Sequence, residues 1–261
     1  MKKWMFILLI LMSMMNDVTA QNADYLFMIE NATKAPSGHN TQPWLFKMKD
    51  AEIDIYPNFS EELPVVDPIH RELFVSLGCA TENLCIAAQQ KGYQTEVRIT
   101  NDSVIRVLLT KDEKAPCSSL LFPQIALRQT NRSVYNGEDI PEDSISLLKN
   151  VAKEPFVGVY FYKKGTADYT KIANMVYAGN RLQMKNEAFK TELKKWMRYN
   201  KTHQDKTRDG LSYAVFGAPN IPLFIAKWAM SNAINEKTQN KSDRKKIASS
   251  SHFVLFTTKD D

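Results

Sequence analysis

The sequence is poor in the residues from which metal sites and covalent catalytic centres are built. It has three cysteines and four histidines among 261 residues, and neither type recurs at the spacing of a metal site. It lacks the glycine-rich and Walker phosphate loops and the H-E-x-x-H zinc motif, and it lacks the G-x-S-x-G turn of hydrolases. We therefore expect no metal ion, and no side chain is assigned as a catalytic acid, base or nucleophile.

Disulfide bonds are not expected to shape the fold. Cys79 and Cys85 stand six residues apart in one predicted helix, too far along it to pair with each other. We expect both to be small, buried, apolar residues, and Cys117 to lie in a loop. Because the count is odd, at least one thiol stays unpaired or pairs between chains.

The charge of the chain is mildly positive and evenly spread. The formal net charge is +5, and acidic residues are interleaved with the basic ones. Nucleic acid binding needs a dense basic face, so no nucleic acid partner is expected. The most basic stretch, residues 185–208, contains Trp196 and Tyr199. We interpret it as a solvated helix face, with phosphate or membrane contact as the alternative.

The first twenty residues have the pattern of a secretory signal peptide. Lys2 and Lys3 precede an apolar run over residues 4–15, and Val18-Thr19-Ala20 offers a small-residue cleavage site. The run is shorter than the ~20 residues of a membrane-spanning helix. We expect residues 1–20 to be removed and the mature chain to be exported to the periplasm without stable membrane insertion. An uncleaved N-terminal membrane anchor is the alternative.

Hydrophobic periodicity predicts an α+β fold. The first half is expected to hold a helix over 22–33 with Leu26, Ile29 and Ala32 on its apolar face, a hairpin over 44–48 and 52–56, a helix over 70–91, and strands over 94–99 and 104–109. The helix over 70–91 has the clearest pattern. Its apolar residues recur at helical spacing before Gly92: Leu73, Leu77, Ala80, Leu84 and Ala87.

The second half has a different pattern, which begins after a loop-like bridge over 111–122. We expect a helix over 142–152, a strand over 157–162, mostly helical structure over 167–200, 221–234 and 236–249, and a late strand over 252–257. The predicted domains after the signal peptide are a first half over 21–120 and a second half over 121–261.

One polar segment framed by prolines allows two interpretations. Residues 35–44 set Ser37, His39, Asn40 and Gln42 between two prolines and end at Trp44. Turn-forming residues explain a loop between a helix and a strand equally well. A rigid frame of hydrogen-bonding groups also suits a flat ring with polar edges. The residues alone leave both interpretations open.

A second segment places two arginines four residues apart. Arg128 and Arg132 flank Thr130 within residues 128–135. Such a pair is usually a solvated basic turn. The alternative is a phosphate clamp, because guanidinium groups match phosphate oxygens and a hydroxyl adds a neutral donor.

Both segments resemble motifs of the nitroreductase family. Residues 35–44 are similar to its flavin-binding turn, and residues 67–84 look like the helix that follows in the Acg-like branch. Residues 207–211 and 217–219 are similar to that branch too, so the resemblance runs from about Tyr25 onward. It implies a nitroreductase-like fold, a mixed sheet with flanking helices, built from two fused nitroreductase-like halves.

The resemblance also implies a binding site for FMN. In this family one subunit supplies the turn and the other an Arg-x-Ser-x-Arg motif that holds the phosphate; residues 128–132 match that motif with threonine for serine. Each half keeps one complementary part, which implies one flavin per chain. The residues implied at the ring are Pro36, Ser37, His39, Asn40 and Gln42, and those at the phosphate are Arg128, Thr130 and Arg132.

The implied activity is that of an FMN-dependent oxidoreductase. Hydride would pass from NAD(P)H, bound transiently, through the flavin to a small-molecule acceptor such as a nitroaromatic or quinone. A non-catalytic flavin-binding or storage protein and an inactive truncated relative are the alternatives. The electron acceptor is the expected partner, and a homodimer is left open.

The family pattern further implies a C-terminally incomplete second half. Acg-like chains continue past the strand that matches residues 253–257 with another long helix and a strand. We therefore expect the late strand to be a poorly covered edge with apolar residues left exposed.

Overall fold

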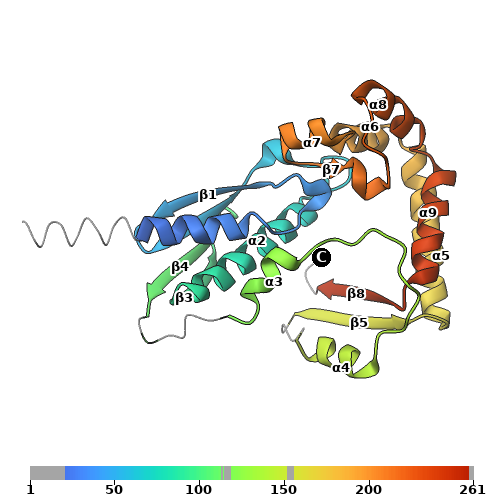
Figure 1. The fold of residues 1–261 in the computed structure, drawn as a ribbon. Coiled ribbons are helices and arrows are strands. Elements are labelled where there is room, and N and C mark those ends of the chain that lie inside the picture. Colours follow the sequence, from blue (N-terminus) through green and yellow to red (C-terminus); the bar gives the residue numbers. More distant parts are fainter. Residues whose placement is uncertain (1–20, 113, 115–118, 152–155, 259–261) are drawn as a thin grey trace, which may run out of the picture. The chain divides into compact units, whose positions relative to one another are not determined.

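The structure is a computed structural model that describes residues 21–112, 114, 119–151 and 156–258. The chain divides into two compact units, Met1–Thr130 and Asn131–Asp261, and each is described by itself. Helices and strands occur in both (Figure 1), which confirms the α+β class. The predicted signal peptide and Cys117 lie outside the described residues.

A four-stranded antiparallel sheet forms the framework of the first unit. Its strands run in the order β1-β2-β4-β3. They are β1 (Trp44–Lys49), β2 (Glu52–Pro57), β3 (Tyr93–Ile99) and β4 (Ile105–Lys111). The hairpin β1–β2 pairs Trp44 with Pro57 and Lys49 with Glu52. The predicted hairpin and the two following strands are confirmed.

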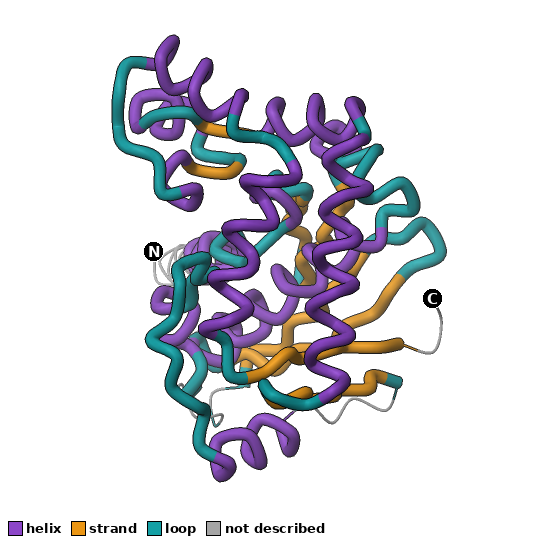
Figure 2. Tube along the Cα trace, turned by 90° about the vertical axis from the view of Figure 1, so that its right-hand side faces the viewer, coloured by secondary structure: helices purple, strands orange, loops and turns teal. Residues whose placement is uncertain are grey.

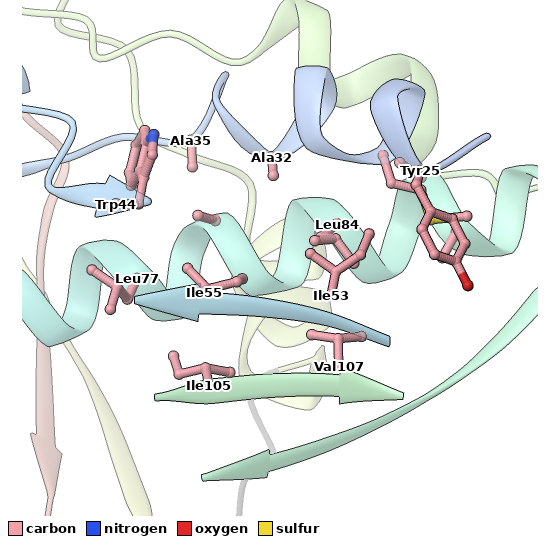
Figure 3. Packing of buried hydrophobic residues seen from close by; sticks show 14 of the residues in the cluster. Tyr25, Ala32, Ala35, Trp44, Ile53, Ile55, Leu77, Leu84, Ile105 and Val107 are labelled. Atoms are coloured by element: carbon pink, nitrogen blue, oxygen red, sulfur yellow. The ribbon is translucent and has the colours of Figure 1, made fainter. Parts of the chain in front are cut away.

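Two helices cover this sheet and enclose the main hydrophobic core. Residues 21–32 are helical, and α2 (Arg71–Gln90) is the long helix predicted from the leucine and alanine spacing. Figure 3 shows Leu77 and Leu84 of α2 between Ile53 and Ile55 of β2 and the residues of the N-terminal helix. All five apolar residues used to predict α2 are buried, so burial of that stripe directs the helix onto the sheet.

The N-terminal helix packs against the core through Ile29 and Ala32, as predicted, but not through Leu26. Tyr25, Met28 and Ala32 are buried, whereas Leu26 is 51% exposed. The prediction that Leu26 marks the apolar face was therefore wrong. Tyr25 takes the inward position beside Leu26, because its ring packs edge-on against Tyr93 of β3 at 6.1 Å between centroids and a large aromatic side chain gains most from burial.

A charged cluster occupies the opposite side of strand β2 from Ile53 and Ile55. Asp54 is fully buried and accepts hydrogen bonds from Arg106 Nε at 2.9 Å and from Lys49 Nζ. The hydrogen bond from Arg106 is the main cause that lowers the Asp54 pKa to about 2. The carboxylate thus ties β1, β2 and β4 together from within.

The predicted loop over 111–122 runs into a helix that the sequence pattern did not predict. Residues 111–122 were expected to form a loop throughout, but α3 (Phe122–Leu127) begins at its end with a proline in the first turn. Ile125 is buried, and Phe122 stacks on Phe27 at 5.4 Å. Six residues are too few for a periodicity to be recognised, whereas proline in a first turn is a known start position.

The second unit combines a two-stranded sheet with two long helices. Strands β5 (Val157–Lys163) and β8 (His252–Thr258) pair antiparallel. Helices α5 (Ala167–Lys185) and α9 (Glu236–Ser249) pack side by side (Figures 1 and 2). The Tyr169 hydroxyl donates toward Ile247 O at 2.5 Å, and Asn180 Nδ2 donates to Asp243 at 2.9 Å. The helix α4 (Glu142–Val151) precedes β5.

The stretch predicted as helical over 167–200 is interrupted twice. Asn186 ends α5 and caps α6 (Glu187–Trp196), because its side-chain oxygen accepts from Ala188 N and Phe189 N. A short strand β6 (Met197–Arg198) then pairs in parallel with β7 (Leu211–Ser212). Between these strands lies α7 (Lys201–Thr207).

Residues 185–208 are also less solvated than predicted. Trp196 and Tyr199 are buried, and so is Arg198, which donates to Asp209 at 2.8 Å. The interpretation as a solvated helix face therefore fails for the part that packs beneath α8 (Leu223–Asn232). The many basic residues made this stretch look fully exposed, although its aromatic side chains are buried.

Strand β8 leaves apolar side chains exposed, as the sequence predicts. Val254, Leu255 and Phe256 are 45%, 45% and 60% exposed. Within the described residues, this sheet consists of β5 and β8 alone.

Parallel pairing in the described chain is confined to β6 and β7, and the longer strands all pair antiparallel.

Candidate functional site

The predicted flavin turn is fastened to the first unit by two serine hydroxyls. Ser37 Oγ accepts a hydrogen bond from Gln42 N at 3.0 Å, which closes the turn on itself. Gly38 N donates to Ser76 Oγ of α2 at 3.3 Å, which joins the turn to the helix beneath it. The segment therefore has a fixed shape set by its own side chains, as the frame of prolines and polar residues predicts.

Three residues of this turn adopt a conformation that side chains normally avoid. His39, Asn40 and Gln42 have φ angles of 47°, 56° and 55°, and the first two lie in the short 3-10 helix η1 (Gly38–Asn40). Each such residue costs ~1–2 kcal/mol relative to a right-handed backbone. Clusters of left-handed residues other than glycine occur where surrounding structure imposes a shape, often at ligand sites.

The residues of the turn differ in their exposure to solvent. Asn40 is exposed, while Pro36, Ser37, His39 and Gln42 are half-buried. Trp44, which closes the segment, is buried and packs near Ala35 in the core (Figure 3). The tryptophan thus anchors the turn, whereas Ser37, His39, Asn40 and Gln42 keep part of their surface exposed.

The first arginine of the second motif lies against the turn. Arg128 is the residue that ends α3, and its Nη2 donates to the backbone oxygen of Lys34 at 3.2 Å. Burial raises the pKa of the Cys79 thiol on α2, and the charge of Arg128 opposes that effect. Arg128 therefore sits between the start of the turn and the middle of α2, within one compact unit.

The rest of the arginine motif crosses the boundary between the units. Thr130 is the last residue of the first unit, and Arg132 belongs to the second; both are exposed. Asn131 Oδ1 accepts from Ser133 N at 2.9 Å, and Tyr135 N donates to Ser249 Oγ at the end of α9 at 3.0 Å. The structure thus brings Arg128 to the turn and fixes the segment after Arg132 to the second unit.

Two residues at the turn were not predicted as site residues. Glu72 and Ser76 of α2 lie one helical turn apart, and Ser76 Oγ donates to Glu72 O at 2.7 Å. A Cβ atom placed on Gly38 would lie 3.0 Å from Glu72 Oε2, so the carboxyl group borders the turn closely. Burial is the main cause that raises the Glu72 pKa.

Their spacing in the sequence contains a usable signal. Residues four apart on a helix share one face, and Ser76, one turn after Glu72, is buried in the stripe that also holds Leu73 and Leu77. A buried serine within an apolar stripe indicates that another segment presents a polar backbone group there. Here that group is the amide of Gly38.

Within the described residues, no group of three or more potential metal ligands comes together. This part of the chain likewise contains no helix with the length and apolar character needed to cross a bilayer. An open hollow of about 860 Å³ lies in the second unit, along the first turns of α9. The hollow is wide open to solvent and is bordered only by polar and charged residues, so it differs from the enclosed pocket with apolar side chains that a flat ring needs.

Comparisons with known proteins point to one enzyme class. No protein-family model matches the chain. The chain is similar to two proteins of Mycobacterium tuberculosis named "Putative NAD(P)H nitroreductase", MT3217 and Rv3131. Identity is 30% over 122 residues in both cases, which is 45% of this chain and 36% of each relative. The chain thus matches about a third of the length of these relatives.

This similarity agrees with the resemblance expected from the two motifs. It supports a relationship to the nitroreductases at the level of a shared segment. The α+β architecture is compatible with a nitroreductase-like fold.

Proposed function

We propose that this protein is an FMN-dependent oxidoreductase of nitroreductase type. It would take hydride from NAD(P)H and pass it through the flavin to a nitroaromatic or quinone-like acceptor. Three features support the proposal: the polar turn, the arginine motif, and the similarity to the two mycobacterial proteins. The proposal includes one flavin for each chain, with the two halves contributing complementary parts.

The contact between Arg128 and Lys34 carries this proposal. The two motifs are separated by more than eighty residues in the sequence, yet Arg128 donates to the carbonyl group directly before the turn. A flavin mononucleotide needs polar groups for its ring and cations for its phosphate within one ligand length. The contact supplies the first cation at the position where the ring-facing segment begins.

The donor set of the turn suits the edges of an isoalloxazine ring. The hydroxyl of Ser37 uses its oxygen to accept from Gln42 N and keeps its proton for donation. Asn40 and Gln42 carry amide groups that both donate and accept, and Pro36 and His39 complete the half-buried border. These residues would orient the ring, and bound FMN would supply the hydride chemistry.

The phosphate end would be held by Arg128, Thr130 and Arg132. All three are exposed, so no existing packing would have to be broken for a ligand to reach them. Arg128 uses Nη2 for Lys34 O, and a guanidinium has further N–H groups for phosphate oxygens. Thr130 would add a neutral hydroxyl donor.

We further propose that the chain is exported and matured by loss of residues 1–20. The basic start, apolar run and small-residue site support this. Mass spectrometry of the protein recovered from a periplasmic fraction tests it, with a new N-terminus at Gln21 as the expected result. Recovery of intact chain from the membrane fraction would contradict it and favour an anchor.

Flavin content and turnover test the proposed function directly. The mature chain is purified, reconstituted with FMN, and examined by absorbance. We expect the yellow flavin band in the visible blue, and its bleaching by NADH or NADPH under anaerobic conditions. Reoxidation by a nitroaromatic or quinone should then restore the band.

Each alternative function has its own result in this experiment. A stable yellow band that neither nucleotide bleaches, although dithionite does, would favour a flavin-binding protein without turnover. The absence of a band after reconstitution would favour an inactive relative. A Ser37→Ala/Gln42→Ala variant should lose the band, whereas an Arg98→Ala variant should keep it, because Arg98 is exposed on β3 and pairs with Glu96.

A further inference from the structure

Helix α8 presents an apolar face to solvent. Phe224 and Trp228 are 75% and 71% exposed, and Leu223 beside them is 46% exposed. The other side of the helix carries Ala226 and Met230, which are buried in a small core. Phe224 and Trp228 stand four residues apart and therefore share one helical face. An exposed face of this kind marks an interaction site.

The next helix presents a basic face. Lys237, Lys241, Arg244 and Lys245 of α9 are all exposed, and their spacing of four, three and one residues places them along one side of the helix. They lie along the open hollow of about 860 Å³. The outward side of α9 is therefore a stripe of positive charge.

The acidic residues of α9 do not neutralise this stripe. Asp243 accepts from Asn180 of α5 at 2.9 Å and so points toward the neighbouring helix. Glu236 accepts from Arg181 of α5 at 3.3 Å. Both carboxylates are thus engaged with α5. Arg244 also contacts that helix, because its guanidinium lies 4.3 Å from the centroid of the Tyr177 ring, whereas Lys237, Lys241 and Lys245 are exposed.

The apolar and basic faces lie on consecutive helices. Only residues 233–235 separate α8 from α9, and Figure 1 shows the two helices adjoining at one corner of the second unit. The cations occupy the first three turns of α9, the end nearest α8. Lys227, exposed between Phe224 and Trp228, adds a further positive charge to α8.

We propose that these two helices form a reversible docking surface for an anionic lipid bilayer. Exposed tryptophan and phenylalanine side chains are stabilised at the boundary between headgroups and acyl chains. Lysine and arginine beside them are attracted to anionic headgroups. α8 has ten residues, so it would lie in the headgroup plane and would not span the membrane.

Charge complementarity selects this partner over the other two that an exposed surface of this kind could bind. A second copy of the chain would bring two basic stripes together, and like charges in contact are unfavourable. Nucleic acid would match the cations, but it would leave Leu223 and Ile225 exposed to water. An anionic bilayer satisfies both faces at once. The inference does not depend on the proposed flavin chemistry.

Vesicle binding tests the inference with the full mature chain. The protein is sedimented with vesicles of phosphatidylcholine alone and with an equimolar mixture of phosphatidylcholine and phosphatidylglycerol. We expect binding to the anionic vesicles only, weakened by salt. Trp228 reports the contact, because Trp44 and Trp196 are 7% and 2% exposed. Its emission should shift to the blue and be quenched by brominated lipid, and Trp228→Phe should abolish that shift.

Two variants and two matched controls make the result specific. Phe224→Ser and Lys241→Glu/Lys245→Glu should each weaken binding at least ~10-fold. Phe256→Ser removes another exposed phenylalanine, from β8, and Lys47→Glu/Lys114→Glu reverses two exposed charges of the first unit. Both controls should bind like the wild type. Circular dichroism confirms that every variant is folded.

Several outcomes would overturn the inference. These are no binding of the wild type to anionic vesicles, equal losses in the test and control variants, and tighter binding to nucleic acid than to lipid. A wild-type dimer that Phe224→Ser converts to a monomer would also overturn it, since that result assigns the apolar face to a second copy.

Discussion

Arg128 donates a hydrogen bond from Nη2 to the backbone oxygen of Lys34 at 3.2 Å. The contact joins the arginine motif to the segment directly before the polar turn, across most of the first unit's sequence. Two motifs that are far apart in the sequence are therefore in contact at this point.

Removal of the two arginines should discriminate between FMN and riboflavin. Charge-assisted hydrogen bonds contribute ~1.5–3 kcal/mol each, so Arg128→Ala/Arg132→Ala should weaken FMN at least ~100-fold. Riboflavin lacks the phosphate and should lose little affinity. Quenching of flavin fluorescence gives both dissociation constants, and Arg98→Ala serves as the matched arginine control. Equal losses for both ligands would show that the arginines shape the turn and do not hold phosphate.

Relief of backbone strain should separate stability from binding in the turn. Gln42 and Ala51 have φ angles of 55° and 56°, and glycine adopts this conformation without a steric penalty. Gln42→Gly and Ala51→Gly should each change stability by less than ~1 kcal/mol, usually upward. Only Gln42→Gly should weaken FMN, because it removes an amide from the ring border. Urea unfolding and flavin titration provide the two measurements, and equal flavin affinity in both variants would exclude Gln42 from the ring site.

The buried carboxylate of Asp54 should make the protein sensitive to strong acid. Its pKa in the folded state is lowered to about 2, first by the hydrogen bond from Arg106, and lies below that of the unfolded chain. Its stabilisation is therefore complete above about pH 4 and is lost as the pH falls toward 2. Melting temperatures between pH 6 and pH 2 should fall less steeply for Asp54→Asn than for the wild type, from a lower starting value.

The matched control for this pH effect lies in the same hairpin. Asp50 is exposed at the turn between β1 and β2, so Asp50→Asn should leave both the melting temperature and its pH slope unchanged. A wild-type slope in Asp54→Asn would show that other carboxyl groups govern acid unfolding.

Two glycines with similar backbones should differ sharply in their tolerance of alanine. Gly210 and Gly217 have φ angles of 72° and 68°. A Cβ on Gly210 would lie 2.4 Å from Trp196 O, whereas one on Gly217 would meet nothing within 4 Å. Gly217→Ala should cost ~1–2 kcal/mol from the backbone alone, and Gly210→Ala ~1–3 kcal/mol more from overpacking. Urea unfolding of both variants measures the difference, and equal costs would contradict the close packing around β6 and β7.

Helix and strand positions with strong periodicity were predictable from the sequence. The stripe through Leu77 and Leu84 identified α2 because one side of that helix is buried along its whole length. The alternation of Ile53 and Ile55 identified β2 for the same reason. The sequence pattern failed at Leu26, where a distant aromatic partner, Tyr93, decides which face of the helix turns inward.

Breaks within long helical stretches were harder to predict. Residues 167–200 contain enough apolar and helix-forming residues to suggest one element, but the cap at Asn186 and the short strand β6 divide it. Asparagine is favoured at such caps, but it also occurs within helices. Which of the two occurs depends on tertiary packing, such as the burial of Trp196 at the end of α6.

The polar turn itself was recognisable in the sequence, but the contacts that hold it in place were not. Ser37, Asn40 and Gln42 were apparent from the polar turn. Ser76 and Glu72 required knowledge that Gly38 lies over α2, which is a contact between segments 38 residues apart. The role of Trp44 as an anchor depended equally on tertiary packing. Long-range contacts of this kind leave no local pattern in the sequence.

The uncovered strand β8 bears on how this protein behaves when it is produced in quantity. From Phe253 to Thr258 no charged side chain interrupts the strand, and its middle residues are exposed. A strand edge without lysine, proline or a bulge is a template on which foreign strands assemble. Heat or denaturant should therefore drive the chain into insoluble deposits through this segment, and a lysine at position 255 would act as a gatekeeper against them.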